Sequence, residues 1–124
     1  KASDPLALIG DLNVAPDDID CYAPDFLEGE VGISRPERDA LEHVRAFGFT
    51  DVFRAFHAGK PKQFSFFDYR VRDSFKYRKG WRIDHIWVTG PLASRALSCE
   101  IDLEPRAAEK ASDHTPVVAT FQAA

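Results

Sequence analysis

The stretch "GWRIDHIWVTG", residues 80–90, decides the fold, because its apolar residues predict a buried strand that nevertheless carries two ionisable side chains. A buried carboxylate costs free energy unless it is paired or hydrogen-bonded. Asp84 therefore needs a partner from elsewhere in the chain. His85 points to the opposite side of the strand from Asp84, and we predict that it is structural.

The sequence on either side of this stretch predicts a helix and several further strands. Residues 6–14, "LALIGDLNV", are expected to form a buried strand that ends in polar residues, before an acidic loop over 15–34. Ser34 and Glu37 form the N-cap and capping box of a helix through residues 37–47. Further strands are expected at 63–70, 81–89, 96–104 and 116–122, with a short helix or turn at 49–56. This order predicts one α/β (α+β) domain, a mixed sheet with helices on one face.

The composition is that of an ordinary globular domain. The 124 residues are 44% hydrophobic and 29% charged, and no apolar run is long enough for a membrane helix or a signal peptide. Cys21 and Cys99 fit no metal-binding spacing. We expect a reduced, cytoplasmic protein with no membrane partner, although one disulfide stays possible. The chain does not begin with methionine, and we expect it to be a piece of a longer protein.

The charge is unevenly distributed along the chain. The net charge is −4, yet residues 1–30 carry −7 and residues 60–82 carry +6. The basic segment also contains seven aromatic residues. Basic and aromatic residues together suit a nucleic-acid backbone with a stacked or everted base. A solvated basic hairpin with core aromatics is the alternative interpretation.

Two further motifs carry polar groups at strand ends. Asp11 and Asn13, two residues apart, point to one face, where they can hold a water molecule, a metal or a phosphate, or simply form a turn. Asp113 and His114 precede the final strand. His114 can be the partner that Asp84 needs, because a carboxylate orients an imidazole by accepting a hydrogen bond from it. The remaining histidines, His43 and His57, are predicted to be structural.

Taken in sequence order, "GDLNVAP", "FSFFDYR", "GWRIDHI" and "SDHTPV" resemble the second half of the exonuclease III class of AP endonucleases, in the endonuclease/exonuclease/phosphatase superfamily. The resemblance covers nearly the whole chain. It implies half of a four-layered α/β sandwich. It also implies a DNA-repair phosphodiesterase that uses Mg²⁺ (or Mn²⁺) and acts on double-stranded DNA with abasic sites or 3′ ends, as an AP endonuclease and 3′–5′ exonuclease.

The resemblance also implies roles for individual residues. Asp11 is similar to the aspartate that orients or deprotonates the attacking water, and Asn13 to the asparagine that binds the scissile phosphate. Asp84 matches the partner of the catalytic histidine, His114, and Asp113 matches a carboxylate of the metal site. Substrate-binding positions complete the set: Phe66, Trp81, Ile83 and Arg82.

The sequence departs from this family in one respect. The family's first half supplies a metal-binding glutamate, an asparagine and a tyrosine, and no residue here matches them. We therefore expect the C-terminal part of the domain, with the N-terminal half absent, one of the two packed sheets missing and an apolar face exposed. The isolated chain is expected to be inactive. The alternatives are a non-catalytic DNA-binding or assembly fragment, and another metal-dependent phosphoesterase of the same superfamily.

Overall fold

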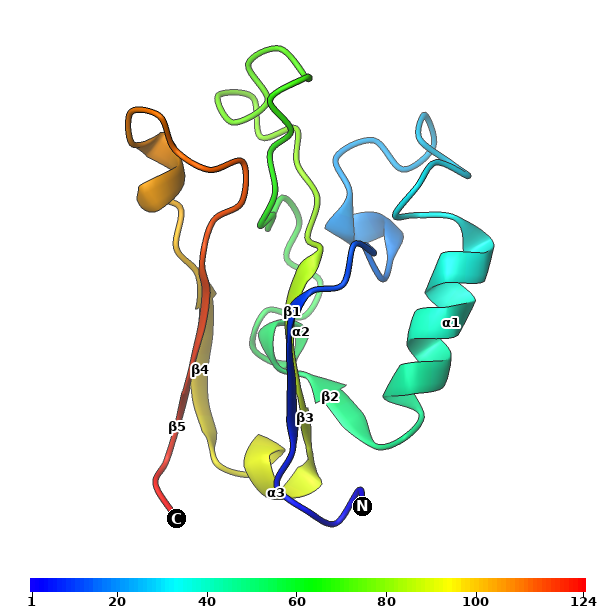
Figure 1. Ribbon diagram of the computed structural model, residues 1–124, viewed down its shortest axis with the longest axis vertical. Coiled ribbons are helices and arrows are strands. Elements are labelled where there is room, and N and C mark those ends of the chain that lie inside the picture. The colour runs from blue at the N-terminus through cyan, green and yellow to red at the C-terminus, as the bar shows by residue number, and fades with distance from the viewer.

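A computed structural model describes all 124 residues, and it contains two small antiparallel sheets with helices around them (Figure 1). The first sheet has the order β1-β3-β2. Its central strand, β3, runs antiparallel to both neighbours. The second sheet pairs β4 with β5, also antiparallel. The strands are β1 (Ala7–Asp11), β2 (Phe49–Asp51), β3 (Asp84–Thr89), β4 (Ala96–Ile101) and β5 (Val117–Phe121).

The helices are short except for α1 (Arg35–Arg45), which begins where the capping motif predicts. Its N-cap residue Ser34 donates both its backbone N–H and its hydroxyl to Glu37 Oε2, at 3.2 and 2.5 Å. The other helices are η1 (Asp18–Asp20), α2 (Val52–Phe56), α3 (Gly90–Ala93) and η2 (Pro105–Ala107). None of the helices is both long and apolar enough to cross a membrane.

The two faces of β3 bury different cores. On one face Val88 packs with α2 residues Val52 and Phe53 and with Cys99 of β4, which joins the two sheets. On the other face Trp87 packs with Leu41 of α1 and Val14. Figure 1 shows the result as layers, with the β4–β5 sheet, the β1-β3-β2 sheet and α1 in that order. Both cysteines are buried and free, so no disulfide joins them.

The α/β class is confirmed, but two details of the prediction are wrong. Strands of two sheets are present, and all their pairings are antiparallel, so there is no mixed sheet within the chain and the second sheet is not missing. Residues 63–70 also form no strand. There, the N–H groups of Ser65 and Phe66 both donate to Trp81 O, while Phe67 N donates to Asp113 O at 2.8 Å. Residues 65–67 therefore lie between Trp81 and Asp113 and form no continuous strand pairing with either.

Apolar side chains are exposed on three strands, as expected for part of a larger fold. They are Ile9, Leu97 and Val118. Gly80, the first residue of the stretch 80–90, packs against residues 64–67. A Cβ atom there would lie 2.7 Å from Phe66 O and 2.8 Å from Phe64 Cβ, so only glycine allows this contact.

Candidate active site

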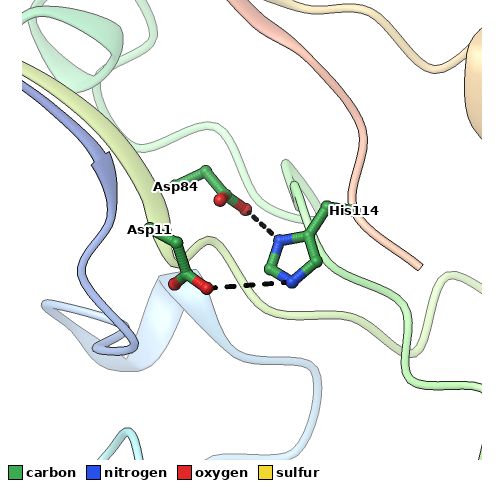
Figure 2. Close-up of side chains that lie close together, drawn as sticks. All are labelled: Asp11, Asp84 and His114. Carbon is green, nitrogen blue, oxygen red and sulfur yellow. Dashed lines mark hydrogen bonds and ion pairs between the residues drawn. The ribbon is translucent and has the colours of Figure 1, made fainter. Parts of the chain in front are cut away.

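His114 lies between two carboxylates at one end of the three-stranded sheet (Figure 2). Its Nδ1 donates to Asp84 Oδ2 at 2.8 Å, which confirms the hydrogen bond predicted for the carboxylate of the strand. Its Nε2 is 3.8 Å from Asp11 Oδ2. The side chains of Asp84, His114 and Asp11 are 19%, 34% and 38% exposed. The cluster is therefore half-buried, fixed on one side and open to solvent on the other.

The register of the sheet explains how Asp11 reaches this cluster. The last residue of β1, Asp11, is paired directly with the first residue of β3, Asp84. Beyond the strand, Asn13 adopts a positive φ of 54° and donates its backbone N–H to Asp11 Oδ1 at 2.9 Å. This turn is of the kind that Asx residues favour. The motif thus forms the predicted turn and also places Asp11 in the cluster, while its binding of a water molecule, a metal or a phosphate stays a prediction.

Ser65 fixes the position of Asp84 relative to His114. The hydroxyl oxygen of this fully buried serine accepts from the backbone N–H groups of Ile83 and Asp84, each at 3.1 Å. The carbonyl oxygen of Ser65 accepts from Thr115 N at 2.8 Å. One residue therefore holds both the strand that carries Asp84 and the loop that carries His114. It lies inside the "FSFFDYR" motif, but the motif alone did not indicate this role.

A cavity of about 500 Å³ opens beside the cluster; it is called the sugar pocket, after the ligand that the family resemblance predicts for it. Asn13 and His114 line it together with three of the predicted substrate-binding residues, Phe66, Trp81 and Ile83. The ring of Phe66 packs 4.8 Å from that of His114. The structure therefore brings the predicted apolar residues and the predicted polar residues to the same cavity.

Other residues of this pocket were not predicted. Leu27 and Val31 come from the acidic loop, and Arg70 comes from the basic segment. The two apolar residues of the loop lie among acidic side chains, so no apolar pattern in the sequence marks them as pocket residues. Arg70 is held at the rim by Asp68, whose carboxylate accepts from Arg70 Nη2 at 2.8 Å.

Arg82 was predicted to bind substrate, but it does not line the sugar pocket and is only 1% exposed, so the structure gives this prediction no support. Its Nε donates to Asp20 at 2.6 Å and its Nη2 to Asp51 at 2.7 Å. Arg54 Nη2 also reaches Asp20, at 2.5 Å. The sequence could not identify this buried cluster, because Asp20 and Asp51 are 62 and 31 residues away from Arg82.

His85 belongs to this buried cluster, as its predicted structural role requires. Its Nε2 lies 2.8 Å from Val14 O, and its Nδ1 lies 3.4 Å from Arg82 Nη1. A carbonyl needs a donor and a guanidinium needs an acceptor, so the ring fits as the neutral Nε2–H tautomer. Burial and the charge of Arg82 lower the pKa of His85. Burial raises the pKa of Asp51, but the hydrogen bonds and charge of Arg82 outweigh it, and the net pKa is lowered.

The polar cluster has the chemistry to bind a divalent cation. One ligand atom from each of Asp11, Asp84 and His114 lies within 4.8 Å of the other two. Carboxylate oxygens are the ligands that Mg²⁺ and Mn²⁺ favour. The carboxylate of Asp113 is not part of this group of three, although it acts electrostatically on Arg70 at the rim of the sugar pocket. Its assignment as a metal ligand stays a prediction.

Two antiparallel sheets, with two carboxylates and an imidazole gathered at one end of the first, define an α/β protein with a potential metal site. The sequence profile of the Endonuclease/Exonuclease/phosphatase family matches residues 1–114. The chain belongs to this family.

The relatives of the chain are nucleases. It is 36% identical to an exodeoxyribonuclease III of Haemophilus influenzae, over 97% of this chain and 47% of the relative. It superposes on an AP endonuclease from Archaeoglobus fulgidus with a TM-score of 0.95 at 40% identity, over 99% and 48% of the two chains. The 3′ phosphatase NExo from Neisseria, bound to a product DNA hairpin, gives 0.90 at 37% identity, over 95% and 45%. The chain thus spans about half the length of these proteins.

Proposed function

We propose that residues 1–124 supply the Asp–His part of the active site of a DNA-repair phosphodiesterase with AP-endonuclease and 3′–5′ exonuclease activity. The observation that carries this proposal is the placement of His114 between Asp84 and Asp11 at the mouth of the sugar pocket. The nuclease relatives support it. We further propose that the chain is the C-terminal part of the domain and that another segment completes the site.

Hydrolysis joins the oxygen of a water molecule to phosphorus and breaks the bond to the leaving sugar oxygen, which receives a proton. Asp84 holds His114 through Nδ1, so that Nε2 faces the side where Asp11 lies. In our proposal Asp11 orients the attacking water and accepts its proton. In its doubly protonated form His114 donates through Nε2 to a phosphate oxygen, and the amide of Asn13 donates to another, where negative charge develops in the transition state.

We propose that Asp113 is a ligand of the divalent metal, Mg²⁺ or Mn²⁺. A bound cation would supply Lewis acidity and neutralise phosphate charge. Around it, this chain contributes mainly negative groups: Asp68 and Glu30 line the sugar pocket, and Asp11 and Asp84 flank its mouth. These carboxylates would repel a phosphate diester unless a cation balances them, which supports a metal requirement.

The apolar wall of the pocket suits the proposed substrate. Phe66, Trp81 and Ile83 offer a largely apolar surface for a sugar that has lost its base, and the indole N–H of Trp81 is their one side-chain hydrogen-bonding group. Everting a nucleotide costs least where pairing and stacking are already lost. An abasic site in double-stranded DNA therefore fits this wall better than an intact nucleotide does.

Cleavage of a labelled duplex containing one abasic site tests the proposal. The proteins compared are residues 1–124 alone and a chimaera in which they replace the matching half of the Haemophilus influenzae relative. We expect Mg²⁺-dependent, EDTA-sensitive cleavage by the chimaera and little by the chain alone. His114→Ala should lower the rate of the chimaera by roughly 10²–10⁴-fold.

Two results would contradict parts of the proposal. If a folded chimaera left the duplex intact while the unmodified relative cleaved it, the proposed activity would be wrong. A non-catalytic DNA-binding or assembly role would then replace it. If the chain alone turned over the duplex in an EDTA-sensitive way, the activity would stand, but the need for another segment would not.

A further inference from the structure

Where the reaction is proposed to occur, the positive charges of the basic segment (residues 60–82) are already paired with carboxylates. Arg82 is neutralised by Asp20 and Asp51, and Arg70 at the pocket rim is paired with Asp68. By contrast, none of the lysines in this segment forms an ion pair, and all are exposed; they are Lys60, Lys62, Lys76 and Lys79. The free charge of the segment therefore resides on these lysines and on Arg78, which also forms no ion pair.

Two of these lysines line a second cavity of about 430 Å³, the lysine groove. Lys62 and Lys79 are joined there by Arg78, and the lining contains no acidic residue. The other lining residues are Ile19, Cys21, Tyr22, Pro61, Phe64 and Tyr77. The sugar pocket, in contrast, is lined by Glu30 and by Asp68, which is paired with the pocket's one arginine, Arg70. The two cavities thus differ in the sign of the charge that they favour.

The lysine groove and the sugar pocket are neighbours that share a wall. Tyr22 lines both cavities, and its backbone N–H donates to Gly80 O at 3.1 Å. Cys21 of the groove forms a β-bridge with Trp81 of the pocket. Phe64 faces the groove and Phe66 the pocket, two residues apart. A chain-like ligand can therefore occupy both cavities at once.

The groove also has an exposed aromatic ring among its cations. Tyr77 is 58% exposed, and the Nζ atoms of Lys76 and Lys79 lie 5.3 and 5.9 Å from its ring centroid. Arg78 is fixed against Phe75, with its guanidinium 4.1 Å from the ring centroid and Nη1 donating to Phe75 O at 2.8 Å. Cations beside an accessible ring suit a sugar–phosphate strand.

We propose that the lysine groove binds the phosphodiester backbone of DNA next to the nucleotide that enters the sugar pocket. This inference rests on the proposed function, because it takes the same substrate. A carboxylate-rich pocket holds a phosphate poorly without a cation, whereas the groove holds one directly through Lys62 and Lys79. The groove would anchor the strand whether or not a lesion is present, and the pocket would recognise the lesion.

This division of roles between the lysine groove and the sugar pocket is tested by measuring the affinity of the 124-residue chain for a labelled duplex. The method is fluorescence anisotropy, in EDTA and at several salt concentrations. The groove variant Lys62→Ala/Lys79→Ala should bind about tenfold more weakly at low salt, equally for abasic and intact duplexes. Its slope of log affinity against log salt should fall by about two, one for each lost phosphate contact. The matched control Lys1→Ala/Arg35→Ala removes the same charge far from the groove and should bind like the unmodified chain. Circular dichroism checks that all variants are folded.

The remaining outcomes overturn the inference without deciding the proposed function. An unchanged salt slope in the groove variant, or an equal loss in the control, would show that the groove makes no specific phosphate contact. Failure of the unmodified chain to bind either duplex at low salt would have the same meaning. The cleavage assay of the chimaera judges the phosphodiesterase separately. As a further contrast, Trp81→Ala should weaken binding of the abasic duplex only.

Discussion

Two polar clusters each take a residue from the segment 82–84, and they differ in how completely their hydrogen bonds are satisfied. Asp84 contributes to the open cluster with His114 and Asp11, while Arg82, two residues earlier, centres the closed cluster with Asp20 and Asp51. In the closed cluster the side chain of Arg82 is 2% exposed and that of Asp20 is 0%. In the open cluster the Nε2 atom of His114 has its nearest carboxylate 3.8 Å away.

This difference separates groups that hold the fold from groups that can act on a ligand. The guanidinium of Arg82 donates hydrogen bonds to two carboxylates, so few of its N–H groups are available to bind a substrate. His114 is anchored by one nitrogen only. Charged residues of one motif therefore contribute to a closed structural cluster in the case of Arg82 and to an open cluster, proposed to be catalytic, in the case of Asp84.

The largest expected difference between the clusters is in stability. Arg82→Met leaves Asp51 without its main partner and should lower the free energy of unfolding by roughly 3–5 kcal/mol. His114→Ala, at a half-exposed site, should lower it by less than about 1 kcal/mol. Urea unfolding of the two variants measures both values. Equal losses would contradict the assignment of Arg82 to a structural cluster and His114 to a functional one.

The closed cluster should also make the protein sensitive to acid. Because the pKa of His85 lies below its ordinary value of 6.5 in the folded state, His85 is neutral in both states above that pH and its contribution to stability is complete. Below it, the unfolded chain takes up a proton that the folded chain does not, so stability falls as the pH falls. The lowered pKa of Asp51 acts in the same direction at lower pH, below its ordinary 3.8.

We therefore expect the Tm to fall between pH 7.5 and pH 5, and to fall less in His85→Asn. The matched control is His43→Asn, because His43 is exposed on α1. A Tm profile of His85→Asn that is as steep as that of the unmodified chain would contradict the assignment.

The smallest expected effect is on thiol reactivity. Cys99 is fully buried, and burial raises its pKa to about 11, with a further contribution from the charge of Asp51. Its reaction with a disulfide reagent at pH 8 should therefore be slow and limited by opening of the fold. The Arg82→Met variant should react faster than the unmodified chain, and His114→Ala should not. Fast reaction of the unmodified folded chain would show that the closed cluster is not closed.

The sequence predicted the open cluster well because its members lie in motifs at strand ends. The Asp84–His114 hydrogen bond followed from the need of a buried carboxylate for a partner. The capping box at Ser34 and Glu37 likewise depends on local spacing, and it is present. The α/β class was also predicted correctly.

The closed cluster could not be predicted, since each of its charges looks like surface charge when read alone. Asp20 lies in an acidic loop and Arg82 in a basic segment, and only the folded chain shows that they neutralise each other. The strand predicted at residues 63–70 failed for a related reason. Its aromatic residues suit a strand, but its backbone groups bond to Trp81 and to Asp113 in turn, which no local pattern reveals.

The buried hydroxyl of Ser65 has a consequence for anyone transplanting this site to another scaffold. Ser65 touches neither Asp11 nor the imidazole of His114, yet it joins the segments that carry Asp84 and His114 through three hydrogen bonds. A graft that copied only the three visible side chains would leave their separation to chance, and productive geometry tolerates errors of only about 0.5 Å. The smallest transferable unit therefore includes this serine and the backbone on both sides of it.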